Sequence, residues 1–193
     1  MTVEEIYKEL AEHMIKGLMI HDQLADYYDF LGLKGYRKCH EYHYLDEACN
    51  YRKLCKYFVN HHNKLIHIDE IDNPEVIPES WYKYTRQDVD SNTKKNAVKT
   101  GLRIWVEWER DTKELYEQMY KELIDINEVA SACIIKCFVE DVDHELEKAE
   151  KYQLYKEAVD YSLSHIIGEQ EDKCKKYERK LEELGMDKYG KHR

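Results

Sequence analysis

Glycine and proline are scarce in this chain of 193 residues, which contains seven Gly and two Pro. Both prolines, Pro74 and Pro78, lie in one short stretch, so no proline interrupts a helix elsewhere. The sequence has no run of about 18 apolar residues, which excludes a membrane-spanning helix. Its acidic N-terminus, MTVEEIYKEL, does not have the character of a signal peptide. These absences predict an almost entirely helical protein with no membrane partner.

Closely paired cysteines and an excess of basic residues are also missing. The six cysteines form no CxxC pair, and we expect Cys133 and Cys137, one helical turn apart, to act as small hydrophobes on an apolar face. Reduced thiols of this kind predict a cytoplasmic protein. Asp and Glu outnumber Lys and Arg by 40 to 30. Because a nucleic-acid binder needs a basic face to neutralise phosphates, we expect no nucleic-acid partner.

Apolar residues recur at helical spacing in four long segments, which we expect to be helices over about 2–31, 36–62, 91–125 and 128–167. Thr2 and Glu5 form a capping box that begins the first of them. After Gly168 a fifth helix carries a narrow apolar seam, which needs either the end of the bundle or another subunit as its partner. We therefore divide the chain into a bundle, 1–167, and a C-terminal helix and tail, 168–193.

The segment 63–90 contains both prolines and no long apolar stripe. It is long enough to return along the bundle, so the helices on either side of it should run parallel. Only a few residues separate the third helix from the fourth, which predicts an antiparallel pair. The expected architecture is an all-α four-helix bundle with a long crossover and an additional C-terminal helix.

Each apolar stripe is interrupted near its middle by residues that can bind a metal ion. Burying a lone carboxylate is costly, so a buried charge normally has a partner or a metal. Carboxylates and histidines that converge from facing helices of a bundle are how a dinuclear metal site is built. The interrupting residues are His21 in the first segment, His43, Glu47 and Asn50 in the second, Glu109 in the third, and Asp141, His144 and Glu145 in the fourth.

Residues at one level of an antiparallel helix pair have a constant sum of residue numbers, which places the interrupting residues at two levels. The first level holds Glu47, Asn50, Glu109, Asp141 and Glu145. The second, two turns away, holds His21 and His43 and is expected to receive no carboxylate, and Lys148 beside it should extend to water. Each residue also has a plainer interpretation, since a glutamate can flank a stripe and His21 can be an ordinary core histidine.

The chain resembles the ferritin-like superfamily, which includes ferritins, bacterioferritins and rubrerythrins. The resemblance spans about 10–155 and rests on LKGY at 33–36, DEACN at 46–50, WER at 108–110 and FVEDVDHELE at 138–147. It implies that Glu47 bridges two metal ions and that Glu109 and Glu145 are ligands. A register one residue away makes Asp141 and His144 the ligand pair of the fourth helix instead, and both registers remain open.

Two positions depart from the family pattern. Met14 stands where the first helix should supply a glutamate, and Asn50 replaces a histidine; both are weaker ligands for iron. We hypothesise that His21 and His43 rebuild the damaged half of the site.

The resemblance implies a homo-oligomer that binds iron or manganese, with dinuclear iron oxidation (a ferroxidase activity) or storage as its function. The two departures favour the alternative, a metal-free bundle that acts as an interaction or structural module. A DNA-protecting cage is disfavoured because the chain has no basic terminal arm.

Overall fold

The computed structural model describes residues 1–184, and helices are the only regular secondary structure within that range. Four long helices form the bundle: α1 (Val3–Phe30), α2 (Lys34–His62), α3 (Ser91–Asp125) and α4 (Val129–Ala158). Two 3-10 turns, η1 (Glu79–Lys83) and η2 (Arg86–Asp88), lie in the crossover. Two shorter helices follow the bundle, α5 (Leu163–Gly168) and α6 (Gln170–Glu183).

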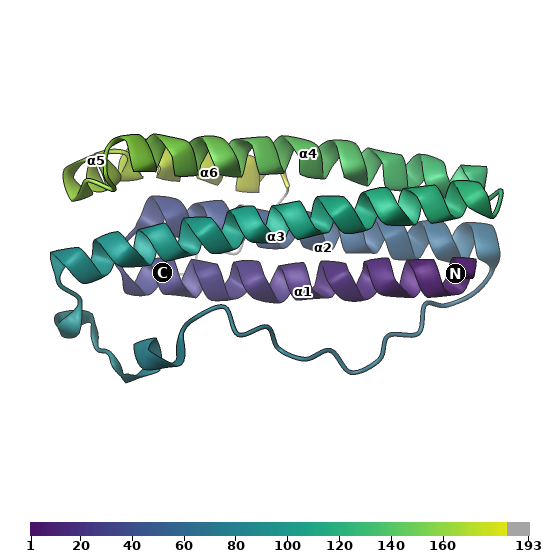
Figure 1. The fold of residues 1–193 in the computed structure, drawn as a ribbon, viewed down its shortest axis with the longest axis horizontal. Helices are drawn as coiled ribbons and strands as arrows, with labels where there is room; N and C mark the ends of the chain where they lie inside the picture. The colour runs from purple at the N-terminus through teal and green to yellow at the C-terminus, as the bar shows by residue number, and fades with distance from the viewer. Residues whose placement is uncertain (185–193) are drawn as a thin grey trace.

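The topology confirms the expected order of directions (Figure 1). Helices α1 and α2 form one antiparallel pair, α3 and α4 form the other, and the crossover returns the chain so that α2 and α3 run parallel. The crossover runs along α1 and is held there by polar contacts at both ends. These pair Lys64 with Glu4, Lys8 with Asp69, Gln23 with Pro74, and Arg86 with Asp29.

Local signals in the sequence account for the helix ends. The Thr2 hydroxyl accepts from the Glu5 amide at 3.2 Å and the Glu5 carboxylate accepts from the Thr2 amide at 2.7 Å, which confirms the capping box. Gly32 has a φ of 71° in the turn between α1 and α2, a conformation that glycine adopts without strain. Asp90 caps α3, accepting from the Thr93 amide at 2.7 Å.

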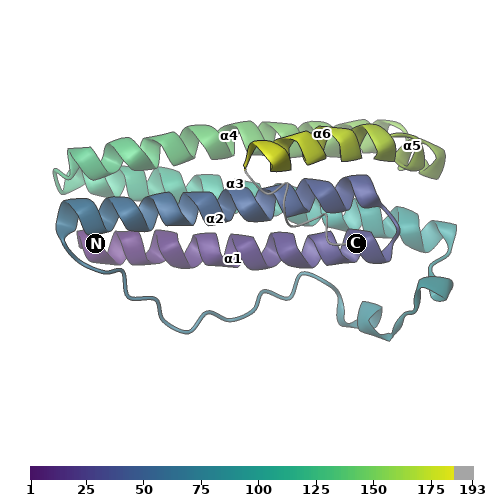
Figure 2. The same cartoon turned by 180° about the vertical axis from the view of Figure 1, so that it is seen from behind.

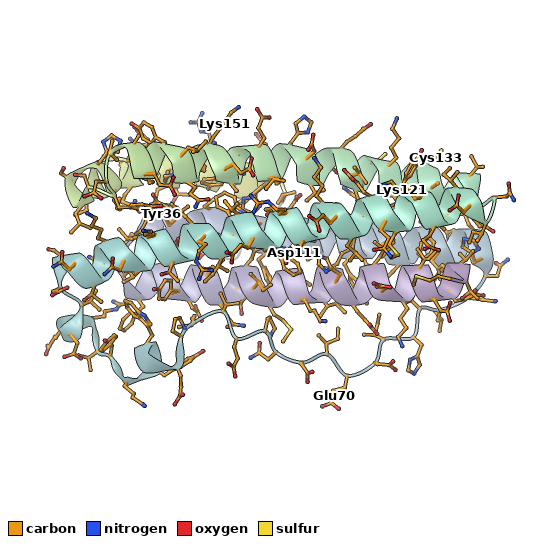
Figure 3. All side chains as sticks on the ribbon, viewed as in Figure 1. Tyr36, Glu70, Asp111, Lys121, Cys133 and Lys151 are labelled. Atoms are coloured by element: carbon orange, nitrogen blue, oxygen red, sulfur yellow. The ribbon has the colours of Figure 1, made fainter. Side chains whose placement is uncertain are left out.

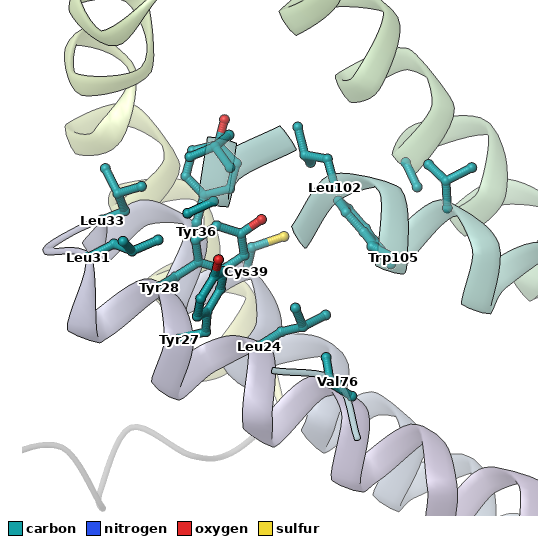
Figure 4. Close-up of a cluster of buried hydrophobic side chains, with 14 of the residues drawn as sticks. Leu24, Tyr27, Tyr28, Leu31, Leu33, Tyr36, Cys39, Val76, Leu102 and Trp105 are labelled. Carbon is teal, nitrogen blue, oxygen red and sulfur yellow. The ribbon is translucent and has the colours of Figure 1, made fainter. Parts of the chain in front are cut away.

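The interior consists of two apolar clusters with a polar group between them. One cluster lies at the end of the bundle that holds the α1–α2 turn, and Figure 4 shows Tyr28, Tyr36, Leu102 and Trp105 within it. The other surrounds the N-terminal half of α1 and includes the fully buried Met14. Because both clusters exclude water, the polar side chains between them face one another instead of bulk solvent.

The fourth helix ends earlier than expected. The sequence predicted a helix to 167, whereas α4 ends at Ala158, and Asp160 and Tyr161 both adopt left-handed backbone angles, with φ of 47° and 51°. Two consecutive left-handed residues break the helix and turn the chain into α5. No glycine or proline lies at this break, so the sequence carried no strong signal for it.

Helix α6 packs against α2 and lies between α2 and α4 (Figure 2). Its Tyr177 is fully buried, so the bundle itself is the partner of the seam that the sequence predicted. A Cβ on Gly35 would come within 2.7 Å of the Gln170 carbonyl, which explains why a glycine stands at this close approach. The tail 185–193 lies outside the described residues, and the division at 167 stays a prediction.

The apolar face of α4 is rotated from the one we expected. Its buried apolar residues are Ala132, Ile135, Phe138, Val142, Leu146 and Ala149, which follow the 3.6-residue repeat. Cys133, labelled in Figure 3, and Cys137 lie off that repeat and are exposed, so the expectation that they line an apolar face is wrong. None of the helices within residues 1–184 is long and apolar enough to cross a membrane.

Candidate metal centre

A small cavity of about 30 Å³ lies between the four long helices, at the level of the polar group. That volume holds roughly two water-sized particles. Its lining comes from all four helices of the bundle. The lining residues are His21, His43, Asp46, Glu47, Asn50, Glu109, Thr112, Tyr116, Phe138, Asp141, Val142 and Glu145.

Three buried histidines meet beside this cavity. The Nδ1 atoms of His21 and His40 are 3.1 Å apart, and the His21 ring stacks on the His43 ring with centroids 5.2 Å apart. Burial, reinforced by the positive charge of Lys148, lowers the pKa of His21 to about 3 and that of His43 well below its usual range. Burial also lowers the pKa of His40 well below its usual range, so all three imidazoles are neutral at pH 7, which is the form that binds metals.

Glu109 is 4% exposed and supplies a carboxylate to the same space. The Trp105 indole donates a hydrogen bond to its Oε1 at 2.8 Å, and His21 Nε2 lies 3.9 Å from that oxygen. Burial raises the pKa of Glu109 to about 8, although the Trp105 hydrogen bond opposes the shift. The carboxyl group therefore stays protonated at pH 7 unless a cation comes close to it.

His21, His43 and Glu109 each offer one ligand atom, and these atoms lie within 4.8 Å of one another. All three residues are buried. Two imidazoles and one carboxylate are the donor set of many non-haem ferrous sites, and zinc also accepts it. This group could therefore hold a divalent metal ion.

Glu47 contributes a second carboxylate to the cavity lining, from α2. Its Oε2 is buried and has no hydrogen-bond partner within residues 1–184. Burial, together with the charge of Glu109, raises the pKa of Glu47 well above its usual range. Gly17 makes room for it, since a Cβ there would lie 3.1 Å from Glu47 Oε1 and 3.0 Å from the Trp108 ring.

The expectation that the histidine level receives no carboxylate is wrong. Glu109 approaches His21 from α3, as described above, and Glu145 Oε2 lies 3.6 Å from His43 Nε2. The expectation for Lys148 is also wrong, because its ammonium turns inward. It donates to Glu145 Oε2 at 2.6 Å and lies 3.1 Å from His43 Nε2. The two predicted levels therefore merge into one polar centre.

The structure brings most of the sequence candidates together, but not all of them. Asp141 is exposed at the cavity mouth, and Asn50 is half-buried in the lining. His144 is exposed, so its side chain faces away from the cavity that Asp141 and Glu145 line. Met14 packs in the apolar cluster and does not line the cavity.

Sequence reasoning missed His40 as a site residue. It is fully buried, and its Nε2 has no hydrogen-bond partner within the described residues. One signal could have found it, because His40 and His43 are three residues apart and therefore share a helix face.

Comparison with solved structures finds the same fold in ferritins. An open-pore ferritin of the hyperthermophilic archaeon Archaeoglobus fulgidus superposes with a TM-score of 0.72 at 14% identity, covering 88% of this chain and 93% of that one. A humanized archaeal ferritin gives 0.73 at 14% identity, covering 89% and 94%. An engineered closed form of the A. fulgidus ferritin gives 0.73 at 13%, covering 90% and 96%. No protein-family model and no curated protein sequence matches the chain.

Proposed function

We propose that this chain, whose all-α bundle has the ferritin-like fold, binds a divalent metal ion and that iron is that ion. The observation that carries the proposal is the buried group of His21, His43 and Glu109, whose ligand atoms lie within 4.8 Å of one another. Manganese is the other ion that the carboxylates of this cavity suit.

The residues present fit a metal ion because their unbound state is unfavourable. Glu47 Oε2 and His40 Nε2 are buried polar atoms without hydrogen-bond partners within residues 1–184. Such atoms cost free energy unless a partner satisfies them. Burial raises the pKa of both Glu47 and Glu109, so a nearby positive ion would replace the protons that these carboxylates otherwise retain.

The function that fits this site is iron oxidation or storage, since the structures that share the fold are ferritins. A bound ferrous ion supplies an electron that an oxidant can accept. His21, His43 and Glu109 would hold the ion, and Trp105 would orient Glu109 through its hydrogen bond. Asp46 and Asp141 at the cavity mouth would attract cations from solvent. We extend the proposal to a homo-oligomeric assembly, as the sequence resemblance implied.

Metal analysis after anaerobic ferrous loading tests this proposal. We expect wild-type protein to retain iron and Glu109→Gln to lose at least ten-fold in affinity, because the amide is neutral and a weaker ligand. His144→Ala is the matched control, since His144 is exposed and should leave binding unchanged. Retention of zinc alone would contradict the choice of iron. Absence of every metal from wild-type protein would refute the site.

A second candidate function is a metal-free module for protein interaction. It is favoured by the position of Met14, which lies fully buried in an apolar cluster where a family ligand is expected. If the chain is such a module, the loading experiment should yield protein without metal, and Glu109→Gln should change only the stability of the protein.

A further inference from the structure

Lys148 is an unusual neighbour for a metal site. It comes from α4, one turn after Glu145, and its ammonium reaches the wall of the cavity between Glu145 and His43. The side chain is 20% exposed, so most of it is removed from water. A lysine that points into a group of metal-ligand residues brings an ammonium to the place where a metal cation would bind.

Aromatic rings hold the ammonium in this position. Its Nζ lies 5.6 Å from the Trp105 ring centroid, 5.5 Å from that of Tyr177 and 6.0 Å from that of Tyr42. Cation–π attraction at these distances stabilises an ammonium that has lost part of its hydration. Tyr177 belongs to α6, so the additional helix of this chain helps to fix the lysine.

The Lys148 ammonium already supplies one of the positive charges that a second metal ion would bring. The cavity is lined by five carboxylates, Asp46, Glu47, Glu109, Asp141 and Glu145. One divalent ion beside the ammonium supplies three positive charges, and two divalent ions supply five. Because cations repel one another in a water-poor interior, each ion added beside the ammonium binds less favourably than it would without it.

The side chains of the site also divide between the metal ion and the Lys148 ammonium. His21, His43 and Glu109 form the group whose ligand atoms lie within 4.8 Å. Glu145, which the family resemblance makes a metal ligand, is already held by Lys148 at 2.6 Å. Its carboxylate therefore has a cation before any metal arrives.

We propose that the Lys148 ammonium takes the place of a second metal ion, so that the centre holds one divalent ion rather than a dinuclear pair. The proposal rests on the function proposed above, because it presumes that His21, His43 and Glu109 bind an ion. Lys148 is a positioning residue in this scheme: it neutralises Glu145 and keeps it away from the metal. An ion bound through His43 Nε2 would displace one hydrogen bond from Lys148 and leave its contact with Glu145 intact.

Metal stoichiometry in the full chain tests the proposal. Wild-type protein is stripped with a chelator, loaded anaerobically with ferrous or manganous ion, and assayed for metal per chain. Electron paramagnetic resonance of the manganese-loaded protein distinguishes isolated ions from magnetically coupled pairs. We expect one isolated ion per chain in the wild type. Lys148→Leu should bind two ions that couple magnetically, because Glu145 is then free to bind a metal.

Lys151→Leu is the matched control. Lys151 lies one turn further along α4, is exposed, and pairs with Glu147 at 2.6 Å, so its removal changes the net charge without touching the cavity. It should keep one ion per chain.

Two coupled ions in the wild type would overturn the inference while leaving the metal site in place, whether or not the leucine variant folds. One ion in both the wild type and Lys148→Leu would also overturn it. Absence of metal from wild type and variant alike would instead overturn the proposed function, and with it this inference.

Discussion

Replacing Glu109 by glutamine should stabilise the metal-free protein at neutral pH, although it removes a proposed ligand. Burial raises the pKa of Glu109 from 4.5 to about 8. At pH 7 the unfolded chain ionises this residue whereas the folded protein keeps it protonated, which favours unfolding by roughly 3 kcal/mol. Glutamine cannot ionise and has nearly the same size, and its amide oxygen can still accept from Trp105.

The difference in stability between the wild type and Glu109→Gln should depend on pH. A carboxyl group with a raised folded-state pKa contributes its full stability below the unfolded value, and that contribution is lost as the pH rises from about 4.5 to about 8. Glu109→Gln should therefore match the wild type at pH 4 and exceed it by roughly 3 kcal/mol at pH 7. Urea denaturation followed by circular dichroism, with a chelator present, measures both values.

Metal should reduce the difference in stability between the two proteins at pH 7. An ion that binds only the folded wild type stabilises it by about 2.7 kcal/mol at one hundred times its dissociation constant, which nearly offsets the roughly 3 kcal/mol advantage of the variant, and the variant gains less because its affinity is lower. Equal stabilities of wild type and variant at pH 4 and pH 7 without metal would refute the argument, because they would mean that water reaches the Glu109 carboxylate.

Two further substitutions test the packing that surrounds the site. Gly101→Ala should destabilise the protein by about 1–3 kcal/mol in thermal denaturation, because a Cβ there overlaps the Tyr28 hydroxyl. Adding Tyr28→Phe should recover part of the loss, since it removes the hydroxyl but leaves the ring carbon 2.8 Å from that Cβ, and a double variant with no recovery would contradict this. Glu169→Gln should cost about 3–5 kcal/mol, since it removes the carboxylate 2.5 Å from the fully buried Lys156 ammonium. Hydrogen exchange should show α6 losing protection in that variant but not in the exposed control Glu171→Gln.

The bundle could be predicted because its signals are local and agree with one another. Apolar periodicity located the four long helices, the capping box located the start of α1, and Pro74 and Pro78 located the crossover. The length of the crossover then fixed the parallel direction of α2 and α3. The break after α4 could not be found, because neither glycine nor proline marks the left-handed positions Asp160 and Tyr161.

The polar residues that line the cavity could be placed at neighbouring levels of the bundle from the sequence, but their contacts could not. Counting residues places Cα atoms, whereas side chains on a helix lean toward its N-terminus. His21 on α1 therefore leans toward the carboxylate level, and Glu109 on α3 leans toward the histidine level, so that the two meet. The same tilt directs Lys148 back toward Glu145.

The inward course of Lys148 also depends on α6, whose contact with the bundle the sequence left open. Lys180 lies 4.4 Å from the Tyr42 ring centroid and Lys176 lies 5.3 Å from that of Tyr177. The surroundings of Lys148 on the α6 side are therefore aromatic and positive, whereas the cavity is lined by carboxylates. Because like charges repel and opposite charges attract, the ammonium is more stable turned toward the cavity than extended along α6. The docking of α6 thus favours the inward position of Lys148.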